Sequence, residues 1–158
     1  MAVSRPRRAR NPASARDAAI ALLSRRDYAT GELRGRLERK GFDRTVVDST
    51  LEELADERAL DDGRYAANYV SYHASRGQGP MRIAADLQAV GLSEALIDAA
   101  LAAGPDWKGI AREVRVRKFG SEVPVEWAEK ARQARFLQYR GFSSDHIRSA
   151  LGADFDLD

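Results

Sequence analysis

The stretch LERKGFDRTVVDSTL, residues 37–51, returns twice at one interval, as LQAVGLSEALIDAAL at 87–101 and as LQYRGFSSDHIRSAL at 137–151. A leucine, a glycine and the apolar residue after the glycine keep their places in all three copies, whereas most polar residues change. Fixed apolar and glycine positions with variable polar ones are typical of repeat folds. The phrase therefore predicts one structural unit that is used three times.

The conserved spacing within the phrase predicts a helix end followed by a turn. A glycine just past the end of a helix adopts the left-handed conformation, and the apolar residue after it packs back onto the last helical turn. We therefore expect a structural role for the glycines and the apolar residues that follow them: Gly41, Gly91, Gly141, Phe42, Leu92 and Phe142.

A new helix is expected immediately after each turn. Asp43, Ser93 and Ser143 follow the turn, and each carries a short side-chain oxygen that suits the N-cap position. Further amphipathic helices are expected upstream of the phrases, at roughly 14–26, 62–76 and 105–118.

These expectations define the fold class and the domain organisation. The sequence predicts an all-α protein with three tandem three-helix repeat units in an elongated, curved modular arrangement. The predicted segments are a flexible basic N-terminal arm, then units one, two and three: 1–13, 14–60, 61–104 and 105–158.

The composition indicates a soluble, mainly helical protein of the cytoplasm. With 44% hydrophobic and 32% charged residues, the chain can bury a core, and no stretch has the eighteen apolar residues of a membrane helix. It contains no cysteine, so disulfides and thiol chemistry are excluded. We expect no membrane association.

Charge is distributed unevenly along the chain. Residues 1–40 hold eleven Lys and Arg against four Asp and Glu, whereas residues 41–62 hold two against eight. The basic segment 4–12 is open to two interpretations, a contact with phosphates or a solubilising terminus.

The sequence shows no motif that indicates catalysis. It has no phosphate-binding GxxxxGK[ST] loop, and its only histidines, His73 and His146, fall in different predicted units. The adjacent Asp61 and Asp62 suit the start of a helix better than acid–base chemistry. We expect no enzyme activity, no cofactor and no metal.

The surface instead offers basic residues. Lys108, Arg112 and Arg115 are spaced i, i+4, i+7, which predicts a basic ridge or, alternatively, a solvated helix face. The tyrosines at 65, 69 and 72 have the same spacing, which is more typical of a core.

Four stretches in order resemble the signature sequences of the RecX family, bacterial regulators of the RecA recombinase. They are LDDGRYAANYV at 60–70, GQGPMRI at 77–83, RKFG at 117–120 and RFLQYRGFS at 135–143. The resemblance runs from about Ala15 to Leu151, with Tyr65 where the family often has phenylalanine and Asp86 where glutamate is common.

The resemblance implies the repeat architecture described above and a function that spacing alone does not give. It implies a non-enzymatic protein that binds RecA and the RecA filament on single-stranded DNA. It further implies inhibition of recombinase, ATPase and co-protease activities, and so a role in DNA repair and the SOS response. A monomer and weak non-specific DNA binding are also expected.

The resemblance further suggests roles for individual residues. Asp61, Asp62 and Arg64 are expected to organise a corner between the first and second units. Partner contacts are expected at basic residues of the second and third units: Arg76, Arg82, Lys108, Arg112, Arg115, Arg117, Lys118, Arg135 and Arg140.

Two other functions remain open on the residues alone. A helix-turn-helix-like DNA-binding regulator is disfavoured, since the candidate recognition helix at 44–57 carries five carboxylates against Arg44. A helical-repeat adaptor for another protein fits the periodicity as well, because repeats specify a scaffold and leave its partner open.

Overall fold

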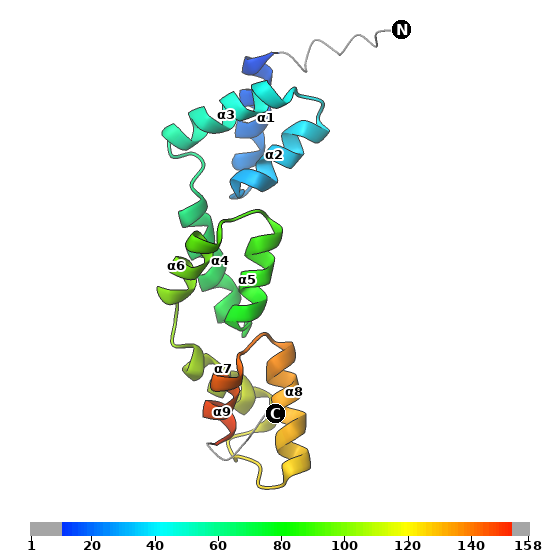
Figure 1. The fold of residues 1–158 in the computed structure, drawn as a ribbon, viewed down its shortest axis with the longest axis vertical. Coiled ribbons are helices and arrows are strands. Elements are labelled where there is room, and N and C mark those ends of the chain that lie inside the picture. Colours follow the sequence, from blue (N-terminus) through cyan, green and yellow to red (C-terminus); the bar gives the residue numbers. More distant parts are fainter. Residues whose placement is uncertain (1–10, 153–158) are drawn as a thin grey trace. The chain divides into compact units, whose positions relative to one another are not determined.

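The computed structural model describes residues 11–152, and over that range the protein consists of nine α-helices without a β-strand. The all-α prediction, with three consecutive groups of three helices, is confirmed (Figure 1). The helices are α1 (Pro12–Leu23), α2 (Thr30–Arg39), α3 (Arg44–Asp56), α4 (Asp62–Ser75), α5 (Pro80–Ala89), α6 (Glu94–Ala102), α7 (Trp107–Phe119), α8 (Trp127–Tyr139) and α9 (Ser144–Leu151).

The start of the chain lies largely outside this range. Of the arm predicted for residues 1–13, the first ten residues are outside the described part, and Pro12 and Ala13 already belong to α1. No helix in the described part is long and apolar enough to cross a membrane.

The described residues form two compact bodies. The first extends to Tyr65 and includes Ala89–Ser93, and the second comprises Ala66–Gln88 and the residues from Glu94 on. Helix α4 therefore begins in the first body and continues in the second.

Local sequence signals explain where several helices begin. Asn11 is the N-cap of α1, where its side-chain oxygen accepts a hydrogen bond from Ala13 N at 3.1 Å, and Pro12 opens the helix. Pro80 is the first residue of α5, a position that suits its fixed φ. Ser143 is the N-cap of α9, and its hydroxyl accepts a hydrogen bond from His146 N at 3.4 Å.

The first and third copies of the repeated phrase close with the same pair of backbone hydrogen bonds. Gly41 N donates to Glu38 O at 2.9 Å, and Phe42 N donates to Leu37 O at 3.3 Å. In the third copy the corresponding distances, at Gly141 and Phe142, are 3.0 and 3.1 Å. Both glycines have a positive φ, +95° and +99°, which explains why glycine is required there.

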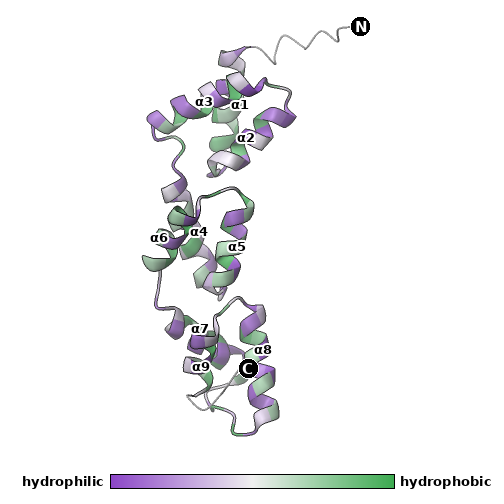
Figure 2. Cartoon of the chain, in the orientation of Figure 1, coloured by the Kyte–Doolittle hydropathy of each residue, from purple (hydrophilic) through white to green (hydrophobic). Residues whose placement is uncertain are grey.

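Each body is built around an apolar core to which the phrases contribute. In the first body Leu37, Phe42 and Leu51 are at most 4% exposed, and in the second body Leu137, Phe142 and Leu151 are at most 1% exposed. Burial of one such side chain stabilises the fold by about 1.5–3 kcal/mol. Hydrophobic and hydrophilic residues alternate along most helices (Figure 2).

Within the second body, backbone hydrogen bonds join the turn after α8 to the start of α5. We call this contact the junction. Gly79 N donates to Arg140 O at 2.8 Å, and Met81 N donates to Gly141 O at 2.9 Å. Free N–H groups at the start of α5 are thus satisfied by the turn that follows α8. The approach is so close that a Cβ atom on Gly79 would lie 2.3 Å from the carbonyl carbon of Gly141.

Candidate functional site

Four basic side chains of the second body meet around one small cavity of about 150 Å³. Arg76 lies one residue past α4, Arg117 and Lys118 lie in the last turn of α7, and Arg140 is the C-cap of α8. We call these four residues the cation cluster. The rest of the lining is apolar: Gly77, Val114 and Phe136.

Phe136 lies at the centre of this arrangement. Lys118 Nζ is 5.6 Å and Arg140 Cζ 5.5 Å from the centre of its ring. The edge of Phe119 packs against the same ring, with the two ring centres 5.3 Å apart. A cation is attracted to the face of an aromatic ring, so contact with Phe136 favours the observed positions of both cations.

The cation cluster carries charge that the fold leaves unneutralised. Within residues 11–152, none of its four members forms an ion pair with a carboxylate. Nearby arginines of the same body do: Arg132 pairs with Glu129 at 2.7 Å, and Arg148 pairs with Asp145 at 3.3 Å. Grouped unpaired cations produce a positive potential that attracts an anionic partner.

The basic ridge predicted on α7 is wrong for Arg115. This side chain is only 3% exposed, and it donates from Nη1 to Glu122 O at 3.2 Å and to Gln133 Oε1 at 3.3 Å. Its Nη2 donates to Ser121 O at 3.3 Å. Arg115 follows the buried Ala111 by one helical turn, so it points into the body and ties down the loop after α7.

The other predicted contact residues remain accessible, at least in part. Lys108 and Arg112 are exposed, and Arg112 Nη1 donates to Ser149 Oγ at 2.9 Å, with Asp106 at 3.8 Å from its other nitrogen. Arg82 and Arg135 are exposed as well. Their part in partner binding stays a prediction.

The sequence pattern does not single out Phe136, and it assigns Tyr72 to the core. The expectation that Tyr72 lies in the core is wrong, because the side chain is 55% exposed and Arg76 Cζ lies 5.0 Å from its ring centre. In both cases an arginine follows the aromatic residue by four positions, Arg76 after Tyr72 and Arg140 after Phe136. That spacing was the available signal, because it places both side chains on one helix face.

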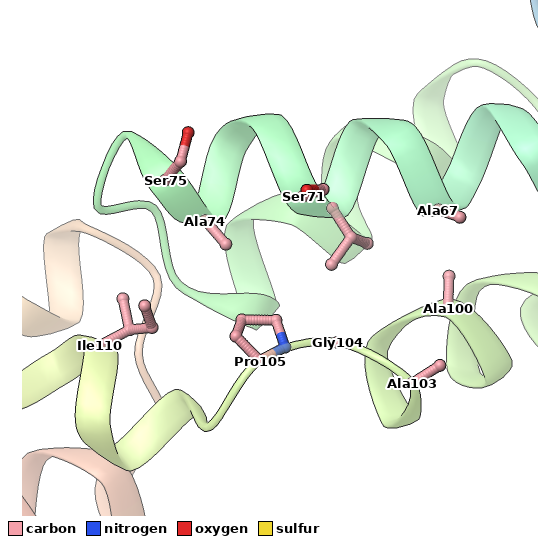
Figure 3. Close-up of a pocket in the computed structure, with 10 residues that line it drawn as sticks. Ala67, Ser71, Ala74, Ser75, Ala100, Ala103, Gly104, Pro105 and Ile110 are labelled. Atoms are coloured by element: carbon pink, nitrogen blue, oxygen red, sulfur yellow. The ribbon is translucent and has the colours of Figure 1, made fainter.

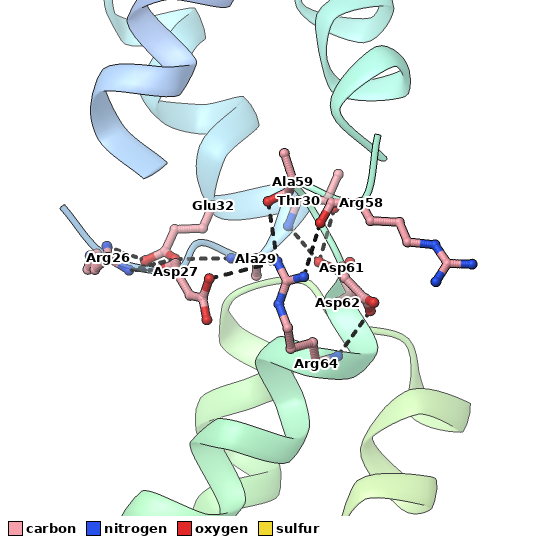
Figure 4. Close-up of polar contacts among 10 residues, drawn as sticks. All are labelled: Arg26, Asp27, Ala29, Thr30, Glu32, Arg58, Ala59, Asp61, Asp62 and Arg64. Atoms are coloured by element: carbon pink, nitrogen blue, oxygen red, sulfur yellow. Dashed lines mark hydrogen bonds and ion pairs between the residues drawn. The ribbon is translucent and has the colours of Figure 1, made fainter. Parts of the chain in front are cut away.

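Asp61, Asp62 and Arg64 lie where the start of α4 meets α2 and the end of α3 in the first body (Figure 4). Asp62 Oδ1 accepts hydrogen bonds from Thr30 N at 2.8 Å and from Thr30 Oγ1 at 3.0 Å. Asp61 Oδ1 accepts from Arg64 N at 3.0 Å.

The Arg64 guanidinium completes this corner. It donates to Arg58 O at 3.0 Å and to Ala59 O at 3.3 Å, and it lies 3.9 Å from Asp27. The two carboxylates therefore bind N–H groups at helix starts, which helix dipoles favour. Their role in organising the corner stays a prediction.

A larger hollow of the second body, about 500 Å³, lies between α4, α6 and the start of α7 (Figure 3). Its lining is uncharged and consists of small and aliphatic side chains, among them Ala67, Val70, Ala74, Ala103 and Ile110. Its only side-chain polar groups are the hydroxyls of Ser71 and Ser75, and it has no charged or titratable residue, so we place the candidate site at the cation cluster.

Comparison with protein families gives three matches along the chain. The matching models are RecX, first three-helix domain, at residues 15–54; RecX, second three-helix domain, at 61–101; and RecX, third three-helix domain, at 110–151. Together they span most of the chain in the expected order.

Curated relatives are similar over nearly their whole length. Regulatory protein RecX of Halorhodospira halophila is 47% identical over 139 residues, which cover 87% of this chain and 86% of the relative. The protein of the same name from Vibrio vulnificus is 40% identical over 139 residues, covering 87% and 91%.

Two solved structures share the fold. The crystal structure of RecX from Lactobacillus salivarius has a TM-score of 0.79 at 19% identity and covers 88% of this chain and 93% of its own. A crystal structure of regulatory protein RecX has a TM-score of 0.75 at 23% identity, with coverages of 88% and 70%. At these identities the likeness concerns the fold alone.

Proposed function

Since this chain belongs to the RecX family, we propose that it is a negative regulator of the RecA recombinase. The observation that carries the proposal is the match of three successive family domains, together with relatives named Regulatory protein RecX that align over most of their length. The protein binds the RecA filament on single-stranded DNA and inhibits its recombinase, ATPase and co-protease activities in the cytoplasm. It thereby acts in DNA repair and in the SOS response.

Regulation by this protein operates through contacts and requires no catalytic residue. A bound protein shifts the conformational equilibrium of its partner in proportion to its preference for one state. A protein that binds more tightly to the RecA conformation that leaves the filament therefore lowers the amount of active filament. The helix repeats supply the scaffold, and the exposed cations of the second body supply the charged contacts.

We assign the contact surface to the cation cluster and to the other exposed basic residues of the second body. The other residues are the exposed Arg82, Lys108, Arg112 and Arg135, and Arg115 is excluded because it is buried. At the dilute concentrations of an activity assay, we expect the protein to act as a monomer.

The test is ATP hydrolysis by RecA from the same organism on single-stranded DNA, titrated with this protein. We expect inhibition with fewer than one molecule of this protein per RecA protomer. As a control, circular dichroism of the added protein checks that it is helical. A lack of inhibition at molar excess would refute the proposal.

The same preparation distinguishes the two alternatives. Tight, sequence-selective binding of duplex DNA at physiological salt would favour a DNA-binding regulator. A pull-down that recovers another major partner and no RecA would favour an adaptor role.

A further inference from the structure

We infer that the cation cluster and two exposed tyrosines, Tyr72 in contact with Arg76 and Tyr139 next to Arg140 in the chain, form a binding site for single-stranded nucleic acid. The inference rests on the proposed function for its biological setting, because a filament regulator meets a single strand. The site itself follows from three features of the second body: converging unpaired cations, a fixed backbone from which they extend, and exposed aromatic rings at neighbouring positions.

The first feature is the convergence of positive charge from separate elements. Arg76, Arg117, Lys118 and Arg140 come from the ends of three helices and line a single cavity. In the described part of the chain these cations have no carboxylate partner. Several cations that face one region can each neutralise a phosphate of a passing strand and release its counterions.

The second feature is the fixed backbone from which the cations extend. The ring of Phe136 holds Lys118 and Arg140 at 5.6 and 5.5 Å. The hydrogen bond from Gly79 N to Arg140 O fixes the end of α8 beside the residues that follow α4. The backbone that carries Arg76 and Arg140 is thus fixed beside one cavity before a ligand binds, which lowers the entropic cost of binding.

The third feature distinguishes a nucleic acid from other polyanions. Tyr72 is 55% exposed and stands four residues before Arg76, and Tyr139 is 81% exposed and directly precedes Arg140. Exposed aromatic rings and guanidinium planes are surfaces on which unpaired bases stack. An acidic peptide would use the cations but not the rings.

The exposed rings also favour single strands over duplexes. Bases within a duplex are stacked on one another and do not offer their faces to a protein. The predicted order of affinity is therefore single-stranded DNA first and duplex DNA of the same length second, with little dependence on sequence.

The experiment measures fluorescence anisotropy of a labelled oligothymidylate with the full-length protein over a series of salt concentrations. The double variant Lys118→Gln/Arg140→Gln is expected to bind at least about tenfold more weakly. In a plot of the logarithm of the binding constant against the logarithm of the salt concentration, the slope should be shallower by about 0.7 for each lost phosphate contact. The variant Tyr139→Ala is expected to bind at least about fivefold more weakly, with the slope unchanged.

The matched control is Arg39→Gln/Lys40→Gln, which removes two exposed cations from the first body and should bind like the wild type. Equal loss in the control and the cluster variant would overturn the inference. So would duplex binding as tight as single-strand binding, or displacement of the oligonucleotide by polyglutamate at equal charge concentration. Circular dichroism verifies the fold of each variant.

The oligonucleotide assay contains no RecA, so it tests the binding site independently of the proposed function. Inhibition of RecA without oligonucleotide binding would contradict the site and leave the proposed function intact. Oligonucleotide binding without inhibition would contradict the proposed function and leave the site intact.

Discussion

Two cation–aromatic arrangements in this protein differ in whether a carboxylate pairs with the cation. In the first body, Arg26 Cζ lies 3.7 Å from the ring centre of Tyr28, and its Nη1 and Nη2 donate to Glu32 at 3.0 and 2.8 Å. In the second body, Lys118 and Arg140 lie over Phe136 without a carboxylate. The first arrangement neutralises its own charge, whereas the second leaves its charge without an ion pair.

A neighbour of the cation cluster shows that the difference is local to the site. Arg132 Cζ lies 5.0 Å from the ring centre of Phe119, yet its guanidinium donates to both oxygens of Glu129, at 2.9 and 2.7 Å. The second body thus neutralises a cation one helical turn away from Phe136 and leaves the cluster unpaired. Position in the fold, and not the type of residue, distinguishes the two roles.

The largest effect is expected from breaking the junction that assembles the cluster. Gly79→Ala would place a Cβ atom 2.3 Å from the backbone of Gly141, so the free energy of unfolding should fall by about 2–3 kcal/mol. Gly35→Ala is the matched control, because its nearest neighbour is the end of the Arg39 side chain at 3.8 Å. The control should gain about 0.5–1 kcal/mol, since alanine favours a helix.

Urea unfolding followed by circular dichroism measures both variants. Oligonucleotide binding should weaken for Gly79→Ala alone, because the bond from Gly79 N to Arg140 O is disturbed. A Gly79→Ala protein as stable as the wild type would refute the described junction.

The next largest effect, on oligonucleotide binding, is expected from introducing a carboxylate into the cation cluster. Arg117→Glu should weaken oligonucleotide binding by tenfold or more, because it removes one cation and neutralises another. Stability should change by less than about 1 kcal/mol, since the side chain is exposed. Arg44→Glu makes the same charge change on the first body, and it should leave the anisotropy titration unchanged. Equal weakening by both variants would show that only net charge matters.

A smaller effect is expected from removing the carboxylate in the first body. Glu32→Gln abolishes the ion pair with Arg26, whose side chain is 49% exposed, so solvent already screens much of the interaction. We expect a loss of at most about 1 kcal/mol in the free energy of unfolding and no change in oligonucleotide binding. Weakened binding would show that the two arrangements are not functionally separate.

The smallest effect is expected on the stability of the protein in acid, through the pKa of Glu129. The hydrogen bond from Arg132, followed by that from Gln133, lowers the pKa of Glu129 to about 2 from an ordinary value near 4.5. A carboxyl with a lowered pKa contributes stability that is fully present above its ordinary pKa and is lost as the pH falls towards 2.

Comparison of urea midpoints at pH 6 and pH 3 tests this effect. The wild type should lose more stability between the two pH values than Glu129→Gln does, because the variant has no carboxyl to titrate. An identical pH dependence of the two proteins would contradict the lowered pKa.

The sequence predicted the fold well because its signals are local. The leucine–glycine–phenylalanine spacing fixes a turn such as that at Gly41 from neighbouring residues alone, and Pro80 marks a helix start through its own backbone geometry. Such features need no knowledge of which helices pack together.

The site was less predictable because it depends on packing between distant segments. Arg115 was placed on an exposed ridge, although the partners that bury it, Gln133 and the loop at 121–122, lie elsewhere in the sequence. Likewise, Arg76 and Arg140 meet only through the junction at Gly79. The basic residues were predicted individually, but not their grouping around Phe136.

The central claim is that the unpaired cations of the second body carry the regulatory function. The most direct measurement compares inhibition of RecA ATP hydrolysis on single-stranded DNA by two triple variants of equal charge change. One is Arg117→Glu/Lys118→Glu/Arg140→Glu in the cluster, and the other is Arg39→Glu/Lys40→Glu/Arg44→Glu in the first body. We predict that the cluster variant needs at least about ten times more protein for half-inhibition, whereas the first-body variant inhibits like the wild type. Equal inhibition by both folded variants would contradict the claim.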